Sequence, residues 1–140
     1  KIKLRSFFVI GFPGEPKKDI QKTIDFAFAL YKKYRVRPNL MIATPLFGTK
    51  LYEISQKENF LVKNITPKDL ALATQARGFG LIKTPDFMPE DLKEFAHQLE
   101  MRIDRLDLIR KLINPREYYK LLKLTLKKPA RIINYLKRII

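Results

Sequence analysis

The chain of 140 residues is 46% apolar, which is enough for a hydrophobic core in one domain or in part of a larger one. It has no cysteine, which excludes a disulfide scaffold and any thiolate metal site within this chain and agrees with a reducing compartment. Its net charge of +15 favours anionic partners, and no apolar run approaches the roughly 18 residues of a transmembrane helix.

Residues 5–43 predict a strand, a helix and a second strand. The first strand is predicted at 5–11, where the apolar run 7–10 is continuous rather than alternating, as is typical of a buried parallel strand. Pro16 fits the first turn of a helix, and residues 35–39, with Pro38, predict the return loop before a strand at 40–43. The helix between, at 17–34, has one face made of Ile20, Thr23, Ile24, Ala27, Tyr31 and Tyr34. Two parallel strands joined by one helix predict a right-handed crossover unit.

Turn residues follow the carboxyl ends of both predicted strands, at 11–15 and at 44–49. Ligands bind at this edge of the sheet in parallel α/β folds, so these two segments are the candidate site. Two strands alone would leave unpaired backbone groups at both edges. Because of this, and because the chain opens on Lys1 almost directly into a strand, we expect further strands upstream in the native protein.

Short helices are predicted next. Thr49 can cap a helix from 51 to about 57. Residues 66–69 have a hydroxyl cap, a proline and an acid at the positions that start a helix, which we expect to run over 70–77. Gly78 and Gly80 end this segment, and residues 81–83 predict a short edge strand.

The longest helix is predicted over 89–113, although Met88 is a poor cap for it. Its apolar stripe consists of Leu92, Phe95, Ala96, Leu99, Ile103, Leu106, Ile109 and Ile113. His97 lies off this stripe and is expected on the surface. Residues 114–117 restart a helix, Pro129 breaks it and residues 130–140 predict the last one. We therefore divide the chain into an α/β part, 1–87, and a helical extension, 88–140.

The extension carries much of the charge, because residues 109–140 contain ten Lys and Arg against one acid, Glu117. The segment 115–140 can lie on an anionic membrane through an apolar face flanked by cations, or pack on its own protein with the cations outward. Nucleic acid is the less favoured partner, since no RNA- or DNA-binding signature is present. No signal-peptide pattern is present either, so we expect a cytoplasmic protein, peripheral to a membrane if 115–140 binds lipid.

Three segments resemble radical SAM enzymes. Residues 9–15, Val-Ile-Gly-Phe-Pro-Gly-Glu, with 19–27 resemble the fifth strand and following helix of that family. Residues 42–52, Ile-Ala-Thr-Pro-Leu-Phe-Gly-Thr-x-Leu-Tyr, resemble the sixth strand and its loop. Residues 80–92 and the basic helical tail resemble the subgroup that carries a cobalamin-binding domain.

The resemblance implies the carboxyl-terminal portion of a partial (β/α)6 TIM-type barrel, with strands five and six, followed by a helical extension. Such enzymes bind a [4Fe–4S] cluster through a CxxxCxxC loop after the first strand and cleave S-adenosylmethionine to a radical. This chain has no cysteine, so the cluster ligands, and cobalamin if it is bound, would belong to the upstream remainder of the polypeptide. A homologue that has lost its cluster is the rival interpretation. The substrate is not indicated, since fold does not choose it.

On the first loop, the resemblance implies cofactor-binding residues at the adenosine moiety. Ile10 and Phe12 would supply apolar contact, while Gly11 and Gly14 would allow a close backbone approach and positive φ. Glu15 would help to shape the nucleoside pocket. Its ordinary structural role would be to interact with free amides at the start of the helix.

On the second loop, Ala43, Thr44 and Pro45 match the end of the sixth strand, which approaches the adenine through its backbone. Simple turn chemistry also explains Pro45 and Gly48, and Thr49 reads best as a helix cap. No acid pair, nucleophile triad, phosphate loop or zinc spacing is present. Because it lacks the cysteines that would bind the cluster, the chain alone is expected to be inactive. The alternative is a non-catalytic basic module that binds an anionic membrane or nucleic acid.

Overall fold

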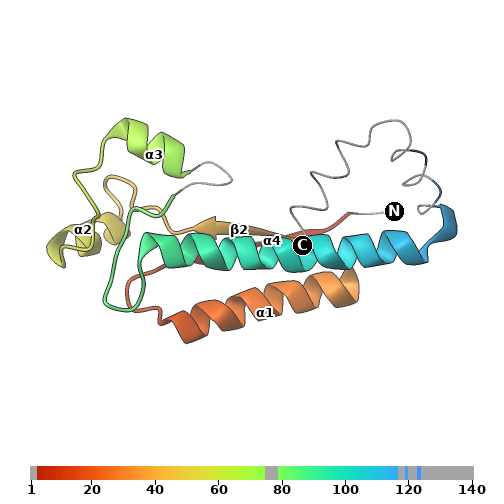
Figure 1. Cartoon of the computed structure of the whole chain (residues 1–140). Coiled ribbons are helices and arrows are strands. Elements are labelled where there is room, and N and C mark those ends of the chain that lie inside the picture. The colour runs from red at the N-terminus through yellow and green to blue at the C-terminus, as the bar shows by residue number, and fades with distance from the viewer. Residues whose placement is uncertain (1–2, 75–78, 117–118, 120–122, 124–140) are drawn as a thin grey trace. The chain divides into compact units, whose positions relative to one another are not determined.

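The computed structural model describes residues 3–74, 79–116, 119 and 123. Figure 1 shows the elements in chain order, from the red amino-terminal strand to the blue end of the longest helix. They are β1 (Arg5–Ile10), α1 (Lys17–Tyr34), β2 (Arg37–Ile42), α2 (Lys50–Lys57), α3 (Pro67–Ala73) and α4 (Pro89–Ile113). The chain divides into two compact units, one extending to His97 and one beginning at Gln98. This division falls within α4.

The predicted parallel pairing of the first two strands is confirmed. β1 and β2 form a two-stranded sheet in which Arg5 is opposite Arg37 and Ile10 is opposite Ile42. The prediction that the first strand is buried on both faces is wrong, because burial alternates along β1 and leaves Phe7 68% exposed. The described chain covers only one face of this sheet.

The return loop predicted at 35–39 is shorter than expected, because β2 already begins at Arg37 and includes Pro38. The Arg37 N–H donates to the Leu4 carbonyl at 3.2 Å, on the β1 side of the strand. The nitrogen of the next residue, Pro38, therefore lies on the opposite edge. A proline is tolerated there because no hydrogen bond from its nitrogen is needed.

Helix α1 has the predicted bounds, and Ile20, Ile24, Ala27 and Tyr31 are buried on its inner face. Tyr34 was expected on that face but is 61% exposed, because it lies at the last turn. The helix ends there with Arg35 in the left-handed region at φ 58°, where its N–H donates to the Tyr31 carbonyl. Pro16 is the residue before the helix and has extended backbone, one position earlier than predicted.

Both predicted caps of the short helices are confirmed. The Thr49 hydroxyl accepts from the Tyr52 N–H at the start of α2. At α3, Thr66 and Asp69 form a capping box in which each side chain accepts from the backbone N–H of the other. Helix α3 ends at Ala73, earlier than the predicted 77, and residues 75–78, with Gly78, lie outside the described part.

The Asp69 carboxylate is expected to make the stability pH-dependent. The Lys63 ammonium, then the Thr66 hydroxyl and N–H, lower the pKa of Asp69 well below its usual range. Stabilisation by such a carboxylate is complete above the unfolded-state pKa of about 3.9 and is lost as the pH falls through the lower folded-state pKa. We expect Asp69→Asn to lower the Tm near neutral pH, and the difference from wild type to shrink below about pH 4.

Thermal unfolding followed by circular dichroism at several pH values measures this difference. Glu53→Gln is the control, since Glu53 is an exposed α2 carboxylate that accepts, within the described residues, from the exposed Lys50 ammonium at 3.3 Å. A Tm difference for Asp69→Asn that stayed constant from neutral to acidic pH would contradict the prediction.

The predicted edge strand at 81–83 is reduced to one isolated antiparallel bridge between Leu61 and Ile82. The long helix α4 has the predicted bounds. Its start is explained by Asp91, whose carboxylate accepts from the Met88 N–H at 2.8 Å. The acid three residues later thus satisfies the amide at the position where Met88 itself has no capping side chain.

The first unit has a core beneath the carboxyl end of β1. Ile10, Ile20, Ile82, Phe87 and Leu92 form this cluster, and each is at most 2% exposed. A smaller cluster of Leu70, Ala73 and Leu81 lies at α3. The main cluster joins β1, α1, the bridge segment and the first turn of α4, so residues far apart in sequence support one strand end.

In the second unit, Leu99 and Ile103 are buried, whereas Ile109 and Ile113 of the predicted apolar stripe are 52% and 75% exposed. The predicted cap at Asn114 is present, because its side-chain oxygen accepts from the Arg116 N–H at 3.1 Å. Most of 115–140, including the predicted break at Pro129 and the last helix at 130–140, lies outside the described residues. Within the described residues, every helix is too short or too polar to cross a bilayer.

Candidate functional site

The carboxyl ends of the two strands bring the two predicted loops together. Ile10 and Ile42 are opposite each other in the parallel register. Beyond them, the Ala43 N–H donates to the Ile10 carbonyl at 2.8 Å. The loop at 11–16 and the loop at 43–49 therefore begin side by side at one edge of the sheet, which is where parallel α/β folds bind ligands.

The first loop is a closed turn around the Glu15 carboxylate. One oxygen of this carboxylate accepts from the Gly11 N–H at 2.7 Å and from the Phe12 N–H at 3.2 Å. The Glu15 N–H donates in return to the Phe12 carbonyl at 3.0 Å. Gly11 and Gly14 have φ values of 89° and 83°, which side chains rarely adopt. Glu15 therefore accepts from backbone amides of the loop before α1, and not from those at the start of the helix where the interaction was expected.

Removal of the Glu15 side chain should open this turn. We expect Glu15→Ala to lower the free energy of unfolding by about 1–2 kcal/mol, because two N–H groups lose their acceptor. Glu15→Gln keeps an acceptor oxygen and should lose about half as much. Urea unfolding measures both, and amide exchange at Gly11 and Phe12 should rise only in the alanine variant. Equal stability of Glu15→Ala and wild type would contradict this role.

The first turn of α4 packs against the same loop through Leu92. A Cβ on Gly11 would lie 2.6 Å from Leu92 Cδ1, so the glycine is required by this close approach. Next to Leu92, Asp91 forms an ion pair with Lys17 at 2.8 Å. The Lys17 ammonium, and then the Met88 N–H, lower the pKa of Asp91.

The second loop is also built from local hydrogen bonds. The Thr44 hydroxyl donates to the Ile42 carbonyl at 3.2 Å, and the Thr49 hydroxyl donates to the Leu46 carbonyl at 2.6 Å. The rings of Phe47 and Tyr52 meet edge to face with centroids 5.1 Å apart. These contacts agree with the turn and capping roles expected for this segment.

The predicted site residues differ in their exposure. Ile10, Gly11, Ala43 and Pro45 are buried, Glu15 and Thr44 are half-buried, and Phe12 and Gly14 are exposed. Ile10 is fully covered by the core of this chain, so of the two residues predicted to supply apolar contact a ligand can reach Phe12, which is 46% exposed. The side chains of Leu46 and Phe47 on the second loop are exposed to a similar degree.

Sequence reasoning identified Asp91 only as the start of a helix and did not connect Lys17 or Leu92 with the site. The acid three residues after Met88 is the signal that could have revealed its capping role. The contacts of Lys17 with Asp91 and of Gly11 with Leu92 join segments more than seventy residues apart. No local pattern encodes such a pairing, so only the fold reveals it.

The chain has no thiolate ligand for an iron–sulfur cluster. It has no cysteine, and the described part contains no group of three or more His, Asp or Glu side chains that could bind a metal. His97 is exposed, as expected. A cluster that works with this site would need its thiolate ligands from outside this sequence.

Comparisons with protein-family models, with curated proteins and with solved structures found no match to this chain. The family resemblance therefore stays a prediction from the motifs.

Proposed function

We propose that this chain is the carboxyl-terminal part of a radical SAM iron–sulfur enzyme of the cobalamin-binding type. Its loops at 11–15 and 43–45 would line the adenosine pocket for S-adenosylmethionine, and the chain alone would be inactive. The observation that carries the proposal is the bond from the Ala43 N–H to the Ile10 carbonyl, since it joins the two motif-bearing loops at one sheet edge.

The exposed sheet face also supports this proposal. Phe7, Val9 and Met41 project from it and are 68%, 43% and 41% exposed. Within the described residues, each strand pairs on one edge only. Large apolar side chains beside an unpaired edge favour coverage by further strands. In a barrel, α1 would lie outside and this face would point to the interior.

The first test is the gene sequence that precedes the codon for Lys1. We expect a CxxxCxxC motif upstream, in frame with this chain. The polypeptide that includes it, reconstituted without oxygen with iron and sulfide, should cleave S-adenosylmethionine to 5′-deoxyadenosine. A start codon next to Lys1 would overturn the proposal, as would an upstream sequence without clustered cysteines.

A matched pair of variants in that longer polypeptide tests the pocket itself. Glu15→Ala should weaken S-adenosylmethionine binding by about tenfold, because the turn that presents Phe12 loses two hydrogen bonds. Glu53→Ala, on the exposed surface of α2, should leave binding unchanged. Equal binding by both variants would exclude the first loop from the pocket.

The concentration of positive charge after residue 109 favours one further candidate, a basic module that binds an anionic membrane. Sedimentation with vesicles tests it. Binding to phosphatidylglycerol vesicles that weakens steeply with salt, and no binding to phosphatidylcholine, would support it. No binding at low salt would exclude it. A gel-shift experiment with a short DNA or RNA duplex tests nucleic acid, the less favoured partner.

A further inference from the structure

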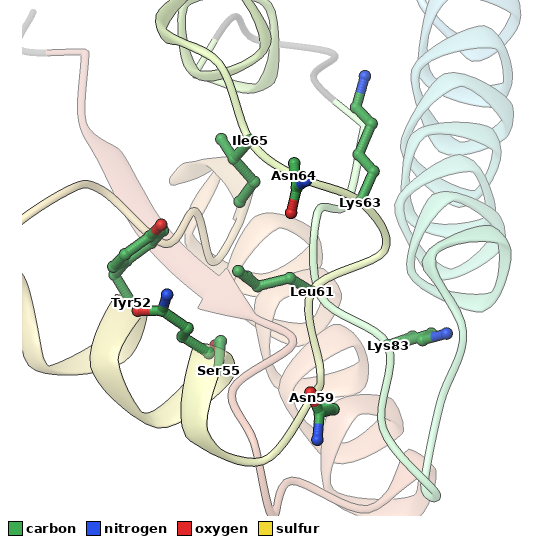
Figure 2. A pocket seen from close by; sticks show the side chains of 9 residues that line it. Tyr52, Ser55, Asn59, Leu61, Lys63, Asn64, Ile65 and Lys83 are labelled. Atoms are coloured by element: carbon green, nitrogen blue, oxygen red, sulfur yellow. The ribbon is translucent and has the colours of Figure 1, made fainter.

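The first unit contains a recess that is separate from the strand-end loops. It has a volume of about 600 Å³, within the usual range of ligand pockets. Helix α2 supplies one wall, the segment from Asn59 to Ile65 a second, and Lys83 contributes from the bridge segment. Figure 2 shows Tyr52 and Ser55 of α2 on one side of Leu61 and Lys83 on the other.

The lining favours a polar anion. The described residues around this recess include no carboxylate, but they include two lysines and three side-chain amides, from Gln56, Asn59 and Asn64. An amide both donates and accepts, so three of them suit a ligand with several hydroxyl groups. Ammonium groups suit a phosphate. Leu61 and Ile65 add a small apolar surface between these groups.

The two lysines differ in their partners. The Lys63 ammonium binds the Asp69 carboxylate at 2.6 Å. The backbone N–H of Lys83 donates to the Phe60 carbonyl at 2.8 Å, which anchors this residue beside the recess. Its ammonium has no partner within the part of the chain that the structure describes. Lys83 is therefore the cation that an incoming anion can bind without breaking an ion pair.

Ser55 gives an independent indication of a ligand. Its side chain lines the recess, is fully buried, and has a hydroxyl oxygen without a hydrogen-bond partner among the described residues. Buried hydroxyl groups in native proteins are nearly always paired, so an orphaned one requires an explanation. A small shift of the Ser55 side chain toward the recess would let a ligand hydroxyl, or a water that the ligand orders, supply the missing bond.

We propose that this recess binds a small phosphorylated polyhydroxyl compound, of the sugar-phosphate class. Lys83 binds the phosphate, the three amides bind hydroxyl groups, and Ser55 completes the floor. The proposal is independent of the S-adenosylmethionine pocket, because the described lining includes none of the residues assigned to the strand-end site.

Amide chemical shifts of the full chain, titrated with ribose 5-phosphate, ribose and inorganic phosphate in turn, test the proposal. We expect saturable shifts at the lining residues with ribose 5-phosphate, and affinities about tenfold weaker for the other two probes. Lys83→Gln should weaken ribose 5-phosphate binding by about tenfold. Lys57→Gln removes an exposed α2 lysine that is not among the lining residues, and should have no effect.

If inorganic phosphate bound with the same affinity as ribose 5-phosphate, the recess would be a simple anion site, and the sugar-phosphate assignment would be overturned. Equal losses for Lys83→Gln and Lys57→Gln would show non-specific charge attraction. No saturable shift at the lining residues would overturn the proposal altogether.

Ser55→Ala provides a second readout. Removal of an orphaned buried hydroxyl should raise the Tm by about 2–5 °C while it weakens ribose 5-phosphate binding. A gain in Tm with unchanged binding would exclude Ser55 from the site. A fall in Tm would show that the hydroxyl has a partner within the protein, which would contradict the orphaned hydroxyl on which the proposal rests.

Discussion

Replacement of Gly11 by alanine is expected to lower the free energy of unfolding by about 2–4 kcal/mol. Two effects combine at this position. The backbone has a φ of 89°, where a Cβ is strained, and that Cβ would lie 2.6 Å from Leu92 Cδ1. Leu92 is fully buried in the main core, so it has little room to move away. Urea unfolding of wild type and variant measures the loss.

Gly14→Ala is the matched control. Gly14 has a similar φ of 83°, but no atom lies within 4 Å of the position that its Cβ would occupy. Only backbone strain remains, so we expect a loss of about 1 kcal/mol. In a double-mutant cycle, Leu92→Ala should remove part of the penalty of Gly11→Ala. Equal losses for the two glycine variants would mean that the Leu92 contact does not constrain the loop.

Phe87→Ala is expected to have the largest effect on stability, about 3–5 kcal/mol. Phe87 is 2% exposed and packs in the cluster that contains Ile10, Ile82 and Leu92. Its main chain is also anchored, since its N–H donates to the Thr84 hydroxyl at 3.2 Å and its carbonyl accepts from the Thr84 N–H at 2.9 Å. Loss of the ring would leave a cavity under the end of β1. We expect a lower free energy of unfolding in urea and faster hydrogen exchange of the Ala43 amide.

Phe7→Ala tests the specificity of that result. Phe7 is also a phenylalanine, but its side chain lies on the sheet face away from this cluster and is 68% exposed. We expect its loss to change stability by less than about 0.5 kcal/mol in this chain. Phe87→Leu keeps most of the side-chain volume, so its loss in the free energy of unfolding should lie between those of Phe87→Ala and Phe7→Ala. A Phe87→Ala variant as stable as Phe7→Ala would contradict the assigned core.

The Phe7 comparison also bears on the proposed function. If further strands cover this face in a longer polypeptide, Phe7→Ala should become strongly destabilising there, because the ring would then be buried. Its effect in the isolated chain and in the longer one would therefore differ by several kcal/mol. The same small effect in both would argue against coverage of the face.

Local signals in the sequence were sufficient for most element boundaries. The 18-residue amphipathic pattern predicted α1 from Lys17 to Tyr34, and the capping residues Thr49 and Thr66 predicted α2 and α3. These signals act within one turn of chain, so they are readable without the fold. The sequence also predicted Glu15 as an acceptor of backbone amides, but it named the amides at the helix start, whereas the partners lie three and four residues before Glu15.

Other features depended on contacts across the chain. Apolar residues at successive positions predicted a strand buried on both faces, but the described residues cover only the α1 side of β1. Pro38 was assigned to a loop, because a sequence does not show which edge of a strand lacks a neighbour. The end of α3 at Ala73 was likewise not marked by a strong stop signal.

The sequence by itself thus determined the helices, their caps and the turn around Glu15, since these depend on neighbours a few residues apart. Only the tertiary structure decided that Leu92 lies against Gly11, that Asp91 pairs with Lys17, and that Ser55, buried without a partner among the described residues, lines the same recess as Lys83. These features result from packing between segments distant in the chain, and such packing depends on the complementary shapes of whole elements rather than on any local pattern.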